Sequence, residues 1–124
     1  MFFFFLQTMK KKFFILRAES SEASARLEYY DSEKKFRSQQ APKKTIVLKT
    51  CFNINRRRDL NKPKHVIALY RRDDCFCLVL DSEDELKQWL RSLLILQSPE
   101  DVVDGETPRP IFGKYLFLNK SEIY

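Results

Sequence analysis

The sequence predicts a mainly β domain with one C-terminal helix, arranged as a seven-stranded, partly open barrel or sandwich that an amphipathic helix caps. Two observations support this fold class. Short apolar segments recur at the spacing typical of all-β domains, and after residue 81 the apolar period changes from that of strands to that of a helix. The chain has 124 residues, of which 44% are hydrophobic, so it can form one domain with a substantial core.

Seven segments have the composition and alternation expected of strands. They are Phe2–Leu6, Lys10–Arg17, Ala25–Tyr30, Thr45–Leu48, Cys51–Asn55, His65–Tyr70 and Cys75–Leu80. Polar turns separate them, and the longest connection is a hydrophilic hairpin loop expected over residues 31–44.

The segment Lys10–Arg17 reads KKKFFILR and combines three lysines with four large apolar residues. Side chains alternate along a strand, so Lys10, Lys12, Phe14 and Leu16 share one face. Two lysines on a core-facing side stay in contact with water unless they are paired. The strand is therefore expected to begin at an open end of the core, where Lys10 and Lys12 form a candidate anion site or, alternatively, only solvate the strand end.

The segment from Ser82 to Gln97 has the apolar period of a helix. Ser82 and Glu85 have the spacing of a capping box, and acidic residues follow the cap in the first turn. The predicted apolar stripe consists of Leu86, Trp89, Leu90, Leu93, Leu94 and Leu96 or Gln97. The expected domain is residues 1–98, and residues 99–124 are expected to be a linker and tail with one short strand.

Positive charge is concentrated in the first part of the chain. Residues 1–72 carry eighteen Lys and Arg against six Asp and Glu, a net charge of +12, whereas residues 73–124 carry a net charge of −6. Such polarity favours a basic face that meets the phosphates of nucleic acid or of an anionic membrane. Lys11, Arg56, Arg57 and Arg58 are predicted to form a secondary basic surface.

Residue types for catalysis and for metal or cofactor binding are scarce. The chain has one His, two Gly and no nucleophile, phosphate-loop or dinucleotide motif, so we expect no enzymatic activity, no catalytic residue and no cofactor. Cys51, Cys75 and Cys77 lack the partners of a metal site or a disulfide framework, so no metal is expected. Reduced, partly buried thiols fit a cytoplasmic protein.

Several stretches carry a resemblance to a known family. KKKFFILR, LEYY, TIVL, CFNIN and the helix in CFCLVLDSEDELKQWLRSLL together resemble the pleckstrin homology (PH) fold. The run FFILRAESSEASARLEYYDSEKKFR, followed by APKKTIVLKTCFNINRR, is similar to the PH domain of the insulin receptor substrate family, with an invertebrate member the expected source. The resemblance covers about residues 9–97.

The resemblance implies a non-enzymatic docking adaptor. Its PH domain would recruit it to the inner plasma membrane, near an activated insulin or growth-factor receptor tyrosine kinase, and a phosphotyrosine-binding domain would follow, of which TPRPIF could be the truncated start. Lys10 and Lys12 match part of the family's phosphoinositide motif, and Tyr29 and Lys43 match further headgroup contacts by position. The usual Gly-Tyr-Leu start and first-strand lysine are absent, with MFFFFLQT in their place.

Two alternatives remain open at this point. A basic β-barrel could bind nucleic acid, but this needs aromatic residues beside the basic ones on an exposed sheet face, whereas most aromatic residues here have core parity. The other alternative is a module that binds acidic protein segments without lipid specificity. The expected partners are phosphoinositide headgroups or an anionic membrane surface, with no nucleic acid, and the expected location is the cytoplasm, peripheral at the inner plasma membrane.

Overall fold

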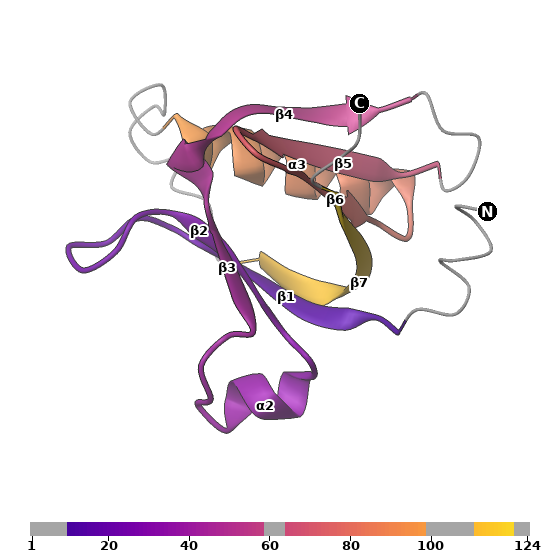
Figure 1. The fold of residues 1–124 in the computed structure, drawn as a ribbon. Helices are drawn as coiled ribbons and strands as arrows, with labels where there is room; N and C mark the ends of the chain where they lie inside the picture. The colour runs from indigo at the N-terminus through magenta and orange to yellow at the C-terminus, as the bar shows by residue number, and fades with distance from the viewer. Residues whose placement is uncertain (1–9, 59–63, 99–110, 121–124) are drawn as a thin grey trace.

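The computed structural model describes residues 10–58, 64–98 and 111–120 of the chain. Its elements follow one another along the sequence as Figure 1 shows. They are β1 (Lys12–Arg17), β2 (Arg26–Tyr30), α2 (Glu33–Arg37), β3 (Lys44–Val47), the single 3-10 turn η1 (Leu48–Thr50), β4 (Cys51–Arg57), β5 (Val66–Arg71), β6 (Cys75–Val79), α3 (Glu83–Gln97) and β7 (Ile111–Lys120).

Seven strands of the described chain form an antiparallel sheet in the order β3-β2-β1-β7-β6-β5-β4. The two edge strands, β3 and β4, are consecutive in sequence and are joined through η1, so the sheet curves round into a partly open barrel (Figure 1). The helix α3 packs against β4, η1 and β5. The predicted fold class, a partly open seven-stranded barrel with one capping helix, is confirmed.

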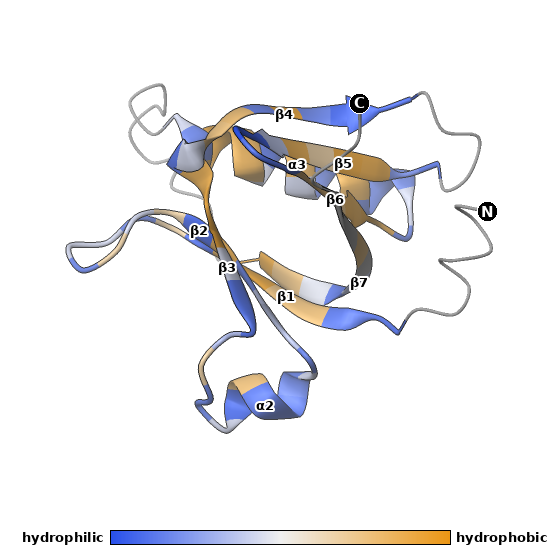
Figure 2. Ribbon diagram, viewed as in Figure 1, coloured by the Kyte–Doolittle hydropathy of each residue, from blue (hydrophilic) through white to orange (hydrophobic). Residues whose placement is uncertain are grey.

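The core of the barrel is aromatic. Phe14 on β1 and Phe76 on β6 are fully buried, and the ring of Phe117 on β7 stacks on Phe76 with centroids 5.1 Å apart. Trp89 of α3 meets Tyr115 of β7 edge to face at 5.5 Å. In Figure 2 the middle of β1 and most of β5 are hydrophobic, whereas the start of β1 is hydrophilic, as expected for a strand that begins at a wet end of the core.

The face alternation predicted for β1 is confirmed. Phe14 and Leu16 belong to the main core, while Phe13 and Ile15 are buried in a second, smaller cluster on the other face of the sheet. Tyr30 completes this outer cluster, so both faces of β1 and β2 exclude water.

The prediction of a hydrophilic loop over residues 31–44 was wrong for residues 33–37, because these residues form the helix α2. The Ser32 hydroxyl caps the helix by accepting a hydrogen bond from the Lys35 N–H at 3.2 Å, and Glu33 pairs with Arg37 one turn later at 2.6 Å. Phe36 packs its ring 5.2 Å from that of Phe13, so α2 covers the outer cluster.

The strand expected near the C-terminus is present, and it is longer and more central than expected. β7 has ten residues and lies between β1 and β6, with Phe14 opposite Gly113 and Leu78 opposite Phe117. It therefore joins the two halves of the sheet. The strand expected over Phe2–Leu6 falls outside the described residues.

The helix predicted after Ser82 is confirmed at both ends. Ser82 caps α3 by accepting from the Glu85 N–H at 3.2 Å, and Leu86, Trp89, Leu93 and Leu96 are buried. The prediction was wrong for Leu94, whose side chain is exposed. Leu94 follows Leu93 directly and is therefore rotated by more than a quarter turn away from the buried stripe.

All three cysteine side chains are buried. Cys75 and Cys77 share one strand face, with their sulfur atoms 3.8 Å apart, and burial raises the pKa of Cys51 to about 11. Across residues 10–58, 64–98 and 111–120, no three metal-binding side chains gather into a group. Within the same ranges, no helix is long and apolar enough to cross a membrane.

Candidate anion-binding site

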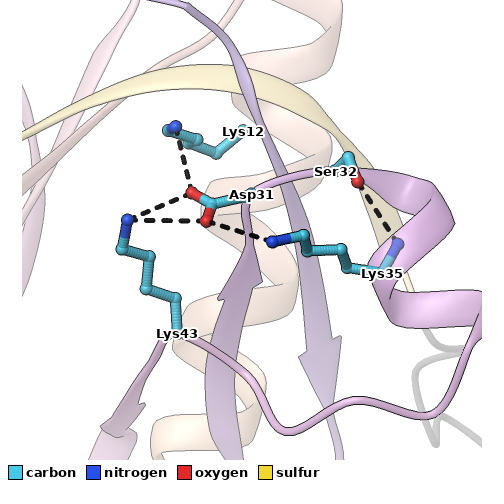
Figure 3. A network of polar contacts seen from close by, with 5 residues as sticks. All are labelled: Lys12, Asp31, Ser32, Lys35 and Lys43. Carbon is cyan, nitrogen blue, oxygen red and sulfur yellow. Dashed lines mark hydrogen bonds and ion pairs between the residues drawn. The ribbon is translucent and has the colours of Figure 1, made fainter.

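Three lysine side chains converge on the carboxylate of Asp31 (Figure 3). The Nζ atoms of Lys12 and Lys43 lie 3.1 Å and 3.2 Å from Asp31 Oδ1, and Lys43 also approaches Oδ2 at 3.5 Å. Lys35 Nζ is 4.0 Å from Oδ2. We refer to Lys12, Lys35, Lys43 and Asp31 as the lysine cluster.

Strand register assembles this cluster from three parts of the chain. Lys12 begins β1, and the pairing of Phe13 with Tyr30 places it beside Asp31, the residue that follows β2. Lys43 directly precedes β3, and its backbone N–H donates to the Tyr29 carbonyl at 2.8 Å.

The third lysine comes from the helix on the outer face. Lys35 lies one turn after Asp31, so the first turn of α2 directs it back to the same carboxylate. The main-chain and side-chain contacts that Ser32 makes hold this turn in place (Figure 3).

The cluster has an excess of positive charge. Three ammonium groups surround one carboxylate, and hydrogen bonds from Lys12 first and Lys43 second lower the pKa of Asp31 below its usual value. The Asp31 and Lys12 side chains remain about one-third and one-quarter exposed, respectively, so the cluster is open to water and to ligands. Such an arrangement can bind a compact, multiply charged anion, with lysine acting as a mobile point-charge partner.

Of the four primary residues predicted from the sequence, Lys12 and Lys43 meet in this cluster. Tyr29 lies next to it but faces the core, where its ring is 4.7 Å from that of Phe117. Burial raises the pKa of Tyr29, and the positive charge of Lys43 opposes this rise. The Tyr29 phenol therefore interacts electrostatically with one lysine of the cluster, although its ring lies in the core. Lys10 is exposed ahead of β1 and makes no ion pair with the rest of the described chain.

Ion pairs partly neutralise the predicted secondary basic surface. Lys11 pairs with Asp81 at 3.0 Å. Arg56 binds Glu83 through both of its terminal nitrogens, at 2.5 and 2.7 Å. These pairs link the start of β1 and the end of β4 to the segment that begins α3, and Asp31 takes part in neither of them. Arg57 is half-buried and Arg58 is exposed at the end of β4.

Two members of the cluster were not identified as site residues from the sequence. Asp31 is acidic, and a search for an anion site passes over acidic residues. The sequence predicts a loop at Lys35, which leaves the direction of its side chain undefined. The available signal was the run DSEKK, in which Ser32 is a suitable N-cap and Asp31 and Lys35 have the spacing of neighbours on a helix.

Comparison with known proteins identifies the family to which this fold belongs. The sequence profile of the PH domain matches residues 3–98. The chain is 59% identical over 92 residues to insulin receptor substrate 1 of Drosophila erecta and 56% identical over 92 residues to that of Drosophila melanogaster. It is 50% identical over 94 residues to insulin receptor substrate 1 of Mus musculus.

These alignments cover 74% of this chain but only 8–10% of each relative. The chain thus spans about a tenth of the length of the curated relatives that it matches. The matched profile and the seven-stranded barrel with its capping helix lead to one conclusion: the chain belongs to the PH domain family and is similar in this region to insulin receptor substrate 1.

Proposed function

We propose that this PH domain is the recruitment module of a non-enzymatic signalling adaptor of the insulin receptor substrate type. It binds the phosphorylated headgroups of phosphoinositides at the inner plasma membrane through Lys12 and Lys43, and thereby brings the adaptor close to an activated insulin or growth-factor receptor kinase. Lys35 is a further ligand for the same headgroup.

One observation carries this proposal: Lys12 and Lys43, thirty-one residues apart in sequence, hold their ammonium groups within 3.2 Å of a single oxygen of Asp31. Ammonium groups that share one oxygen are already at the spacing that a phosphate group needs. A phosphomonoester carries about 1.5 to 2 negative charges near neutral pH and has three acceptor oxygens, so it can satisfy several lysines at once.

Lys10 is exposed near the start of β1 and can add long-range attraction to an anionic bilayer. Each basic residue close to such a surface contributes about 1 kcal/mol to binding. Removing both Lys12 and Lys43 should therefore weaken binding by about thirtyfold, which corresponds to about 2 kcal/mol.

Co-sedimentation with phosphatidylcholine vesicles that contain phosphatidylinositol bisphosphate tests the proposal. We compare the wild type with Lys12→Ala plus Lys43→Ala, and use Lys49→Ala plus Lys87→Ala as the control. Lys49 and Lys87 are exposed on η1 and α3, so the control makes the same change in net charge away from the lysine cluster. Binding should fall for the first pair and stay close to the wild-type level for the control.

Unchanged binding after the loss of Lys12 and Lys43 would remove these residues from the mechanism. Two further probes separate the alternatives: a soluble peptide of glutamate residues and a single-stranded oligonucleotide. If the peptide competes with the vesicles as strongly as soluble inositol trisphosphate does, the site recognises acidic protein segments. Oligonucleotide binding that falls steeply with salt would favour the nucleic-acid alternative.

A further inference from the structure

Asp31 is the centre of the lysine cluster, although its charge is opposite to that expected of an anion-site residue. Its carboxylate lies within 3.2 Å of Lys12 and of Lys43, and within 4.0 Å of Lys35 (Figure 3). A ligand that takes these three lysines must replace Asp31 as their partner.

The contacts of the Asp31 side chain do not indicate a structural role. The N-cap of α2 is Ser32, which follows it, and the polar contacts of the Asp31 carboxylate within the described chain are those with the three lysines. Glu28 presents a useful contrast. Its carboxylate is buried and accepts hydrogen bonds from Arg17, Arg26 and Tyr30, which is the pattern of a carboxylate that stabilises the fold.

We propose that Asp31 is an internal competitor that lowers the affinity of the lysine cluster for anions: its carboxylate occupies the cluster in the free protein and is displaced by the bound anion. This inference rests on the proposed function. When the anion binds, the lysines exchange their contacts with the Asp31 carboxylate for contacts with the anion. No lysine contact is lost if the anion has enough negative charge and enough oxygen atoms to replace the carboxylate.

Charge decides which ligands succeed in this exchange. A carboxylate has one negative charge and two oxygens, and a monoanionic lipid such as phosphatidylserine offers no more net charge than Asp31 already supplies. A phosphomonoester offers about 1.5 to 2 charges and three oxygens. Displacing Asp31 costs the same free energy for every ligand, so a phosphomonoester still binds with a net gain in charge, whereas a monoanionic lipid gains little. Lys12 and Lys43 lower the pKa of Asp31, so it remains an ionised competitor at neutral pH.

The opposite role is an outcome of the same test. If Asp31 mainly holds the lysines at a productive spacing, its removal releases three flexible side chains and weakens binding. The two roles thus predict changes of opposite sign for one substitution.

The experiment compares Asp31→Asn with Glu19→Gln as a matched control. Asparagine keeps the shape of Asp31 and removes its charge. Glu19 is exposed in the loop after β1, at the other end of that strand from Lys12, so the control makes the same change in net charge away from the lysine cluster. Each protein is titrated with phosphatidylcholine vesicles containing either phosphatidylinositol bisphosphate or phosphatidylserine, and with soluble inositol trisphosphate.

Asp31→Asn should strengthen binding to bisphosphate vesicles by about three- to tenfold, as expected for the loss of competing exposed ion pairs. It should strengthen the weaker binding to phosphatidylserine vesicles by a similar factor, because the same competitor is removed. The affinity for soluble inositol trisphosphate should rise by about as much as that for bisphosphate vesicles, because the exchange involves the headgroup and not the bilayer. Glu19→Gln should change each affinity by less than about twofold.

Equal or weaker headgroup binding by Asp31→Asn overturns the competitor role, and so does an equal gain for Glu19→Gln, which would show a general charge effect. Asp31→Ser and the thermal midpoints of all variants exclude a folding defect as the cause. If Lys12→Ala plus Lys43→Ala loses binding while Asp31→Asn gains none, only this inference fails. If neither wild type nor Asp31→Asn binds any phosphorylated probe, the proposed function fails with it.

Discussion

The Tyr115 hydroxyl on β7 donates a hydrogen bond to the Glu85 carboxylate on α3, with the two oxygens 2.5 Å apart. The same hydroxyl accepts a hydrogen bond from the Trp89 indole N–H at 3.3 Å. Burial and the acceptor Glu85 raise the pKa of Tyr115 to about 12, so the phenol remains protonated and able to donate throughout the physiological range. One side chain thereby attaches the C-terminal strand to the capping helix.

Tyr115→Phe should destabilise the domain by about 1–3 kcal/mol, because the buried indole N–H and the carboxylate of Glu85 both lose a partner while the ring remains. Urea unfolding followed by Trp89 fluorescence measures the change. Tyr30→Phe is the control, since its hydroxyl also donates to a carboxylate, that of Glu28, at 3.1 Å. Glu28 keeps Arg17 and Arg26 as partners, so the control should be less harmful. An unchanged unfolding midpoint for Tyr115→Phe would contradict the prediction.

Gly113 lies on the same face of β7 as Tyr115, and a Cβ atom at this position would approach Tyr115 Cε2 to 2.5 Å and Oη to 2.6 Å. Gly113→Ala should therefore push the ring away from Glu85 and Trp89 and destabilise the domain by about 1–3 kcal/mol. In a strand without this ring, the same substitution would be neutral or stabilising.

A double-mutant cycle isolates this close approach. When Tyr115 is already leucine, adding Gly113→Ala should cost much less than it costs in the wild type, because the atoms that it would meet are gone. Equal costs in the two backgrounds would show that the glycine is needed for another reason.

The parts of the fold that the sequence predicts well are those that local patterns determine. The capping helix carries its own start signal, Ser82, and a stripe of apolar residues that specifies its buried face. The faces of β1 follow from alternation alone. Local patterns do not predict α2, because this helix is only five residues long. Its stability depends on the packing of Phe36 against Phe13, which comes from a distant part of the chain.

The residues of the candidate site differ in the same way, because local patterns predict some of them and distant parts of the chain determine the others. Parity along β1 predicts that Lys12 lies at the wet end of the core, and this needs no knowledge of other strands. The position of Asp31 among the lysines depends on the register between β1 and β2 and on the path of the chain into β3, which a single sequence does not specify. Tyr29 matches a family contact by position, yet parity places its ring in the core, and the structure follows parity.

Glu83→Gln should reduce stability in a pH-dependent way. Hydrogen bonds from Arg56 lower the pKa of Glu83 from 4.5 to about 2, so the pair stabilises the fold fully above about pH 4.5. As the pH falls toward 2, Glu83 becomes protonated in the folded state and this contribution is lost. The difference in unfolding free energy between wild type and Glu83→Gln should thus be constant near neutral pH and shrink between pH 4.5 and 2.

Asp84→Asn is the matched control for this measurement, because Asp84 is exposed on the same first turn of α3 and shares its helix-dipole environment. The difference for Asp84→Asn should be smaller at neutral pH, since Glu83 has the bidentate contact with Arg56. A Glu83→Gln difference that persists unchanged down to pH 2 would contradict the assigned cause.

Truncation after Ser98 tests whether β7 is required for folding. The PH profile and the expected domain both end at residue 98, yet β7 lies between β1 and β6 and supplies Tyr115 and Phe117 to the core. Without β7, two strands lose their ladder partners and the rings of Phe14 and Phe76 lose a neighbour. We expect residues 1–98 to lose cooperative unfolding and near-ultraviolet circular dichroism, and to aggregate through the exposed strand edges.

A synthetic peptide of residues 111–120 should restore the cooperative transition, because it can insert as an antiparallel strand between β1 and β6. A peptide with Gly113→Ala is the control, and it should restore the transition less well because its Cβ atom approaches the ring of Tyr115. If residues 1–98 instead fold as a stable monomer without the peptide, another segment must pair with β1 and β6. The strand predicted over Phe2–Leu6 would then be the candidate for that position, and the domain boundary at residue 98 would hold.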